Sequence, residues 1–273
     1  MIGALSPFVD GHPHNGAEEG LIFDDNRRSP LKGQSSSGKP YLRINEALLS
    51  LVTGETREGL SGVVNLNLHI RDARYPKIRE IASLHLVSNL RILNLSYNAI
   101  EQLDGLDFCK HLTELNVAEN QLKSLEGLEK LRLLERLNLS GNDITRISSE
   151  ISGLVHMVSL HLSRNKIHIL EDLLHLQPLK KLHKLRLQGN PLMDIFEEQE
   201  PRDFLAFHLP KLRELDEMDL NSPAAKQRAW LRYGSAASGG SDGVSVEERE
   251  NTNPNQGLGR GPITIGSGSR GLT

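Results

Sequence analysis

Apolar residues recur in this sequence at fixed positions within a short segment that ends in asparagine. Five segments follow the pattern L-x-x-L-x-L-x-x-N, with Met and Val each replacing one Leu, and they end at Asn98, Asn120, Asn142, Asn165 and Asn190. Successive asparagines are 22, 22, 23 and 25 residues apart, and Ile or Leu follows two residues after each. Self-similarity at a near-constant period is typical of repeat proteins, in which each unit packs on its neighbours.

The two central apolar positions of each segment predict a short strand. Leu93 and Leu95, for example, are two residues apart, which places both side chains on one face of an extended chain. Stacked strands would form a concave parallel sheet over an aliphatic core, and each buried Leu would contribute roughly 1.5–3 kcal/mol. The apolar positions after each asparagine suit short helices or 3-10 turns on the convex side: Leu103, Leu106, Leu125, Leu128, Ile147 and Ile151. The pattern predicts an α/β solenoid.

The repeated asparagines have a structural interpretation. The chain turns after each strand, which leaves backbone donors and acceptors pointing inward, and a carboxamide can satisfy both kinds of group. We expect an Asn120→Ala change to cost on the order of 1–3 kcal/mol.

Both ends of the array require caps, because an open end would expose the apolar core. Residues 63–68 fit a degenerate first repeat in which Arg71 stands where Asn is expected, and residues 41–52 have helical periodicity. At the other end, residues 203–209 suggest a helix, and Ser222-Pro223 suggests the start of another. The predicted organisation is a disordered tail (1–40), a helical cap (41–62), repeats with a C-terminal cap (63–221), a short helix (222–233) and a Gly/Ser-rich disordered tail (234–273).

Single residues of chemical interest are few. Trp230 is the only tryptophan, and we favour packing on the cap over contact with a partner. Cys109 is the only cysteine, which excludes an intramolecular disulfide and a multi-cysteine zinc site and agrees with a reducing compartment. His12 and His14 have no carboxylate or Cys beside them, so they make a poor metal site, and we expect neither a metal nor a cofactor.

The amino-acid composition bears on the nature of the core and on the class of partner. Aromatic residues are only 4% of the chain, so the core must be aliphatic, and the net charge of −3 gives no reason to expect nucleic acid or an anionic membrane. The first ten residues lack the basic start of a secretory signal, and no apolar run approaches the ~20 residues that span a bilayer. We therefore expect a cytoplasmic, soluble protein that is monomeric within a larger complex.

The repeats, together with the closing FxxHLPxLxxLD segment that ends at Asp216, resemble the 22-residue class of leucine-rich-repeat proteins. Residues 41–233 are most similar to the N-terminal repeats of centriolin, through the entry residues Tyr41, Glu46, Ala47 and Leu48, residues 90–98, and the lengthened fifth unit. They also resemble the repeat-type axonemal dynein light chain, the protein phosphatase 1 regulatory subunit and the spliceosomal A′ protein. The resemblance implies a non-catalytic scaffold at the cytoskeleton (centrosome, basal body or cilium).

One departure from this resemblance leaves two interpretations open. Centriolin-like proteins continue into long coiled coils, whereas this chain runs into Gly/Ser-rich sequence after Tyr233. It is either a compact relative or a fragment of a longer coiled-coil protein.

The exposed strand positions on the concave sheet are the candidate partner-binding surface. The early repeats carry polar, neutral to mildly acidic residues there, and the late repeats gather basic ones. We hypothesise that the late repeats bind an acidic segment or helix of a protein partner, anchored at its other end by apolar groups. The candidate residues are Ile92, Asn94, Tyr97, Asn116, Arg136, Asn138, His161, Arg164, His183, Lys184 and Arg186.

Catalysis finds no support in the sequence, which has no Gly-rich phosphate loop, no nucleophile elbow and no His-x-x-x-His pair with a supporting carboxylate. We expect a non-enzymatic protein. Phosphatase regulation and nuclear RNA-processing assembly stay open as alternatives, because one fold serves many functions.

Overall fold

The computed structural model describes residues 32–34, 40–195 and 199–234. The chain divides into two compact units, Met1–Ser238 and Gly239–Thr273, and the second lies outside the described residues. The predicted tails therefore fall mostly outside the described part, as do His12 and His14.

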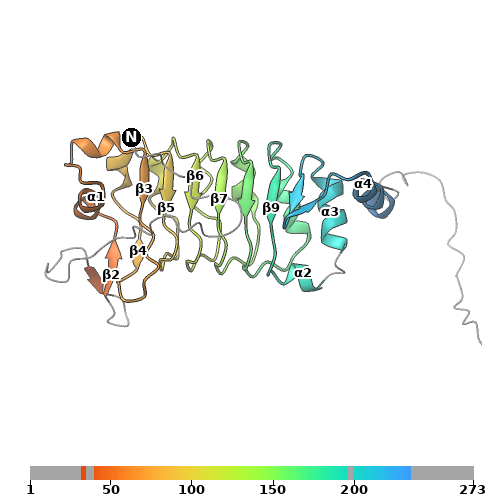
Figure 1. Cartoon of the computed structure of the whole chain (residues 1–273), viewed down its shortest axis with the longest axis horizontal. Helices are drawn as coiled ribbons and strands as arrows, with labels where there is room; N and C mark the ends of the chain where they lie inside the picture. The colour runs from red at the N-terminus through yellow and green to blue at the C-terminus, as the bar shows by residue number, and fades with distance from the viewer. Residues whose placement is uncertain (1–31, 35–39, 196–198, 235–273) are drawn as a thin grey trace, which may run out of the picture. The chain divides into compact units, whose positions relative to one another are not determined.

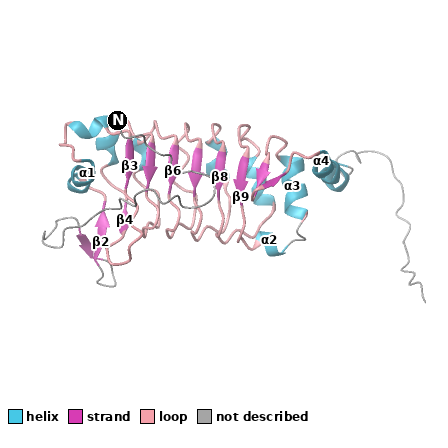
Figure 2. Cartoon of the chain, in the orientation of Figure 1, coloured by secondary structure: helices cyan, strands magenta, loops and turns pink. Residues whose placement is uncertain are grey.

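The main sheet contains one strand from each repeat, as predicted (Figures 1 and 2). Seven strands run parallel without a shift in register, so that Leu93, Leu115 and Leu137 lie opposite one another. An eighth strand turns back antiparallel at the C-terminal edge. In chain order they are β3 (Asn65–Asn67), β5 (Ile92–Asn94), β6 (Glu114–Asn116), β7 (Arg136–Asn138), β8 (Ser159–His161), β9 (Lys184–Arg186), β10 (Glu214–Leu215) and β11 (Met218–Asp219).

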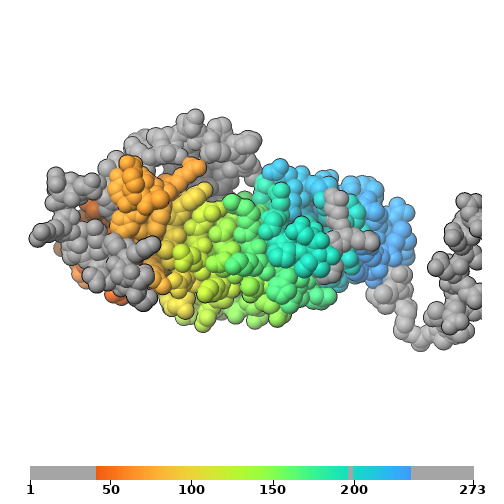
Figure 3. Space-filling model, turned by 90° about the horizontal axis from the view of Figure 1, so that it is seen from below, coloured from red at the N-terminus to blue at the C-terminus, as the bar shows by residue number. Residues whose placement is uncertain are grey.

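The leucines of the pattern form one continuous aliphatic core behind this sheet. Leu115 and Leu137 are completely buried, as are the apolar residues that precede the next strands. The space-filling view shows the repeats as adjacent bands of colour in sequence order (Figure 3). Five return segments contain a 3-10 helix, as the spacing predicted, and the lengthened unit has the longest: η1 (Gly59–Gly62), η2 (Leu84–Val87), η3 (Leu106–Phe108), η4 (Ser149–Gly153) and η5 (Glu171–Leu176). The segment with Leu125 and Leu128 forms turns instead.

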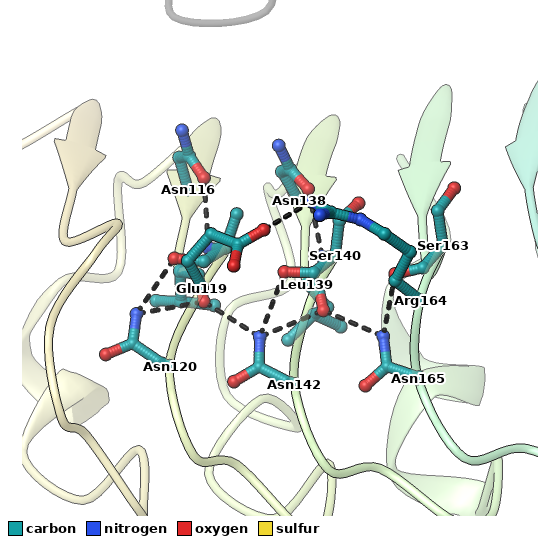
Figure 4. A network of polar contacts seen from close by, with 12 residues as sticks. Asn116, Glu119, Asn120, Asn138, Leu139, Ser140, Asn142, Ser163, Arg164 and Asn165 are labelled. Carbon is teal, nitrogen blue, oxygen red and sulfur yellow. Dashed lines mark hydrogen bonds and ion pairs between the residues drawn. The ribbon is translucent and has the colours of Figure 1, made fainter. Parts of the chain in front are cut away.

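The five repeat asparagines, here called the ladder asparagines, connect each repeat to the one before it (Figure 4). Asn142 Oδ1 accepts from Leu122 N at 3.0 Å, and its Nδ2 donates to Val117 O and Leu139 O at 3.0 and 2.9 Å. Asn165 Nδ2 also donates to Leu139 O, at 2.9 Å. Each carbonyl between two ladder asparagines therefore receives two donors, which confirms their structural interpretation.

The degenerate first repeat has no ladder asparagine, and a lysine makes different backbone contacts beside that position. Arg71 does not enter the ladder and is exposed. Lys77 Nζ instead donates to Ile70 O and, at 3.4 Å, to Asp72 O, after a loop that this repeat alone contains. The burial needed to reach these carbonyls lowers the pKa of Lys77.

The N-terminal cap differs from its prediction. Residues 40–43 form a strand, β2 (Pro40–Arg43), between β1 (Lys32–Gln34) and β4 (Ile78–Glu80), so part of the predicted tail is ordered as well. Helix α1 (Glu46–Thr53) begins only after Asn45, whose side chain accepts from Leu48 N. The helix predicted from residue 41 is therefore wrong over its first residues, because Leu42 and Ile44 alternate inward as in a strand.

The C-terminal cap contains three helices, α2 (Leu192–Ile195), α3 (Glu200–His208) and α4 (Pro223–Ala229), and a π-helical turn at Trp230–Gly234. Ser222 caps α4 through its side chain, as the Ser-Pro start predicted. The expected packing of Trp230 on this cap is wrong, because 59% of the residue is exposed. Ala225 and Ala229 occupy the buried face instead, which directs the following residue outward.

Candidate partner-binding face

The candidate site is the side of the main sheet opposite the leucines, here called the sheet face. Because side chains alternate along a strand, two residues of each three-residue strand and one residue of β10 point to this face. The strand register aligns them in two columns. One column is Asn65, Ile92, Glu114, Arg136, Ser159, Lys184 and Glu214; the other is Asn67, Asn94, Asn116, Asn138, His161 and Arg186.

The four asparagines of the second column each close a small turn with their own backbone. The side-chain Oδ1 of Asn94, Asn116 and Asn138 accepts from the backbone N two residues later at 3.0–3.1 Å, and that of Asn67 does so at 3.4 Å. The side-chain nitrogens of Asn116 and Asn138 point away from these turns (Figure 4). Within the described residues, none of the four Nδ2 groups donates a further hydrogen bond. The column therefore contains a row of amide donors, of which Asn67 is exposed, Asn94 and Asn138 are half-buried and Asn116 is buried (8% exposed).

Arg136 and Glu114 form an ion pair between neighbouring strands. The carboxylate side chain is only 4% exposed, whereas the guanidinium side chain is 36% exposed. The hydrogen bond from Arg136 to Glu114 raises the pKa of the arginine. Arg136, predicted as a partner contact, is thus already engaged within the sheet, although part of its surface remains accessible.

The late repeats do not form a net basic surface, contrary to the sequence interpretation. Lys184 Nζ lies 3.4 Å from Glu214 Oε2, and Arg186 lies 3.7 Å from Glu214 and 2.7 Å from Glu217. Both carboxylates come from the cap, next to β9. Sequence spacing did not reveal them because β10 does not follow the repeat template.

A row of residues in left-handed backbone conformation borders the sheet face. The residue before each ladder asparagine has positive φ: Tyr97 (60°), Glu119 (55°), Gly141 (68°), Arg164 (54°) and Gly189 (74°). Arg164 reaches past Gly141 to form an ion pair with Glu119 two repeats earlier (Figure 4). A Cβ on Gly141 would lie 2.5 Å from the carboxylate oxygen Glu119 Oε1, so the glycine leaves room for this bridge. Arg164 is therefore paired as well.

Of the remaining predicted residues, Tyr97, Ile92 and His161 lie on or beside the sheet face, and His183 does not. Tyr97 is 38% exposed, and the guanidinium of Arg71 lies 5.7 Å from its ring centroid. Ile92 is half-buried in the first column, and His161 Nε2 lies 3.2 Å from Ser159 Oγ. His183 does not belong to the sheet face, because it precedes β9 and its Nδ1 lies 2.5 Å from Lys181 O.

The described part of the chain offers neither a metal site nor a reactive thiol. No three His, Cys, Asp or Glu side chains among the described residues are grouped as a metal site requires. Cys109 is buried, and burial raises the pKa of its thiol to about 11, which disfavours the reactive thiolate. None of the described helices combines the length and apolar character needed to cross a bilayer.

Comparison with known proteins agrees with this geometry. A family model described as leucine-rich repeat matches residues 113–229, and one described as two copies of leucine-rich repeats matches residues 88–130. No curated protein matches the sequence. The chain therefore has the fold of a leucine-rich-repeat solenoid, and residues 88–229 match leucine-rich-repeat models.

Solved structures share the fold at low sequence identity. A chain of the Drosophila melanogaster SNF/U2A′ complex is 21% identical, with a TM-score of 0.50, over 70% of this chain and 92% of that one. A leucine-rich-repeat protein of Leptospira interrogans is 24% identical, with a TM-score of 0.48, over 59% of this chain and 39% of its own length. An internalin of Listeria monocytogenes is 22% identical, with a TM-score of 0.47, over 59% and 49%.

Proposed function

We propose that this chain is a non-catalytic scaffold that binds a protein partner on the sheet face. Leucine-rich-repeat domains generally mediate interactions between proteins. The row of amide donors at Asn67, Asn94, Asn116 and Asn138 is the observation that carries the assignment of the face. A row of hydrogen-bond donors with no acceptor among the described residues suits a ligand rich in acceptors.

The proposed ligand is a helix of the partner with carboxylates on successive turns. Neighbouring strands lie about 4.8 Å apart, and a helix rises about 5.4 Å per turn. Carboxylates one turn apart would therefore meet amide donors one strand apart. Tyr97 and Ile92 would supply apolar contacts beside this row, as aromatic residues do in many interfaces. This moves the proposed contact from the late repeats to the early and middle ones.

Replacing amides by carboxylates tests the site with little change of shape. The triple variant Asn94→Asp, Asn116→Asp, Asn138→Asp keeps the oxygen that closes each turn but removes the donor and adds negative charge. The control Gln102→Glu, Gln121→Glu, Gln199→Glu makes the same charge change at exposed positions off the face. We expect proximity labelling by the triple variant, but not by the control, to lose the principal labelled proteins. An unchanged labelled set, with unchanged circular dichroism, would exclude the sheet face.

The cellular setting is a separate part of the proposal. We further propose a scaffold at the centrosome, basal body or axoneme, on the ground of the resemblance of the repeat motif in residues 41–233 to that of centriolin-like and axonemal repeat proteins. Imaging of a tagged chain should then show staining of one of these structures. The coverage of 92% of a chain in the SNF/U2A′ complex supports nuclear RNA-processing assembly as the second candidate. Nuclear staining with labelled spliceosomal proteins would favour that candidate and contradict the first.

A further inference from the structure

The turns that lead into the strands of the main sheet share one backbone hydrogen bond in six repeats. The first of four residues accepts from the N–H of the fourth at 2.9–3.0 Å, as Cys109 O does from Leu112 N. Because the strands that follow are parallel, these turns lie along one edge of the sheet, here called the turn edge (Figure 2). The central residues of the turns are Ser88-Asn89, Lys110-His111, Arg132-Leu133, Val155-His156, Lys180-Lys181 and Pro210-Lys211. All are exposed except His156, which is half-buried.

The turn edge is positively charged, although the whole chain has a net charge of −3. Its central residues include no Asp or Glu, and the cationic ones are Lys110, Arg132, Lys180, Lys181 and Lys211. None of these five forms an ion pair with a carboxylate of the described residues. The Nζ of Lys181 instead lies 3.1 Å from the ring atom His156 Nδ1. The turn edge differs in this respect from the sheet face, whose cations are paired.

The carboxylates closest in sequence do not neutralise this edge. Asp107 is paired with Lys130 at 2.8 Å. Glu129 accepts from Gly127 N at 2.9 Å, and Glu135 is half-buried next to β7. Five unpaired cations therefore exceed the two carboxylates that are not paired with another cation, and the edge keeps a positive surplus.

Two aliphatic side chains interrupt the row of cations. Leu133 and Val155 lie in consecutive turns and are 43% and 48% exposed. Their neighbours Leu134 and Leu154 are completely buried, so the core is closed without the exposed pair. Cationic turns lie on both sides, because Lys110 belongs to the turn before this pair and Lys180 to the turn after it. The edge is thus apolar at its centre and basic at both ends.

We propose that the turn edge binds an extended segment of a protein partner in which apolar residues are flanked on both sides by carboxylates. The basic ends select acidic flanks by charge complementarity, and the apolar centre is covered by the middle of the segment. From the turn before β6 to the turn before β10 there are four interstrand distances, about 19 Å. An extended chain rises about 3.3 Å per residue, so about six residues span this distance.

Nucleic acid and lipid fit the turn edge less well. A nucleic acid would contact the cations but leave Leu133 and Val155 unused, and no central residue of the turns is a Phe, Tyr or Trp on which a base could stack. A membrane surface gains affinity by burying protruding apolar groups. More than half of both Leu133 and Val155 is already covered by the array, which leaves little to insert.

Fluorescence anisotropy with the full chain tests the proposal. The probe is a fluorescein-labelled synthetic peptide, Glu-Glu-Leu-Val-Glu-Glu, and two reference peptides replace its glutamates by glutamine or its apolar residues by alanine. We expect saturable binding of the probe and binding at least about tenfold weaker for both reference peptides, which corresponds to about 1.4 kcal/mol. A uridine hexanucleotide and phosphatidylserine vesicles should displace the probe less effectively than the unlabelled peptide does.

Matched variants locate the binding. Lys110→Glu with Lys180→Glu should weaken probe binding about tenfold or more, whereas Lys123→Glu with Lys226→Glu, the same charge change at exposed positions off the edge, should change it less than about twofold. Leu133→Ser with Val155→Ser should also weaken it, unlike Leu51→Ser with Ile195→Ser at exposed positions in α1 and α2.

The triple aspartate variant of the sheet face should bind the probe normally, which separates this proposal from the proposed function. The proposal is overturned if the probe does not bind, if either reference peptide binds equally well, or if the edge variants and their controls behave alike. Stronger displacement by the hexanucleotide or the vesicles would also overturn it, since the edge would then be a site for RNA or lipid.

Discussion

Neighbouring ladder asparagines share a carbonyl, which predicts that their loss is not additive. Asn142 and Asn165 both donate to Leu139 O, at 2.9 Å each. In either single alanine variant this carbonyl keeps one donor; in the double variant it has neither. Asn120 and Asn165 share no carbonyl, so they form a control pair of the same residue types.

The expected losses in the free energy of unfolding follow from the number of buried backbone groups that lose a hydrogen-bond partner. Asn142→Ala leaves the buried Leu122 N–H without its acceptor, and Asn165→Ala does the same to Ile144 N–H. A buried group without a partner costs about 1–3 kcal/mol, so each single variant should lose about that much. The double variant additionally leaves Leu139 O without a donor, which adds a coupling of about 1 kcal/mol or more. The control pair should be additive within about 0.5 kcal/mol.

Urea denaturation followed by circular dichroism measures the free energy of unfolding of the wild type, the three single variants and the two double variants. Unchanged m-values would show that the same cooperative unit unfolds in each. Additivity in the Asn142/Asn165 pair would refute the shared-carbonyl reasoning. Equal coupling in both pairs would do so as well, since it would attribute the effect to general loss of the array.

Three further predictions concern single positions. Gly141→Ala should destabilise the fold by about 1–2 kcal/mol because of its left-handed backbone, whereas Gly153→Ala, where a Cβ meets nothing closer than 3.8 Å, should change the thermal midpoint little. The hydrogen bond from Arg146 lowers the pKa of Asp172 below its ordinary 3.8. The resulting stabilisation is present above that pH and is lost as the pH falls through the folded-state pKa; Arg146→Gln should therefore flatten the acid dependence of stability measured from about pH 5 to about pH 2. Asp216→Ala should cost about 1–2 kcal/mol in denaturant unfolding, because its Oδ1 accepts from two backbone N–H groups at 2.7 and 3.0 Å.

The interior of the solenoid could be predicted from the sequence because the residues that determine the strand and the turn of each repeat lie within that repeat. The period-two leucines determine the strands, and the asparagine after them determines the turn. The parts of the chain outside the repeat template could not be predicted in this way. Lys77 contacts the backbone beside the missing asparagine from beyond an inserted loop, and β2 lies where a helical pattern was equally visible. Neither contact is encoded by local spacing.

The columns of the candidate sheet face were predicted from the sequence, but the pairing of their charges was not. The columns followed directly from strand register, yet the pairing of Lys184 and Arg186 depends on Glu214 and Glu217 from the cap. The amide turns of the asparagine column were also missed, although Asn is known to bond its own backbone two residues on. This tendency, together with the alignment of four asparagines in the repeat pattern, could have predicted the turns.

The constant register of β5, β6 and β7 determines how the length of the sheet face could change. Ile92, Glu114 and Arg136 align across these strands at intervals of 22 residues, so removal of one such unit would bring Ile92 opposite Arg136 with the same pairing. The sheet face would shorten by one interstrand distance, about 4.8 Å, and lose one amide donor. The length of the sheet face can therefore change only in steps of one repeat between the two caps.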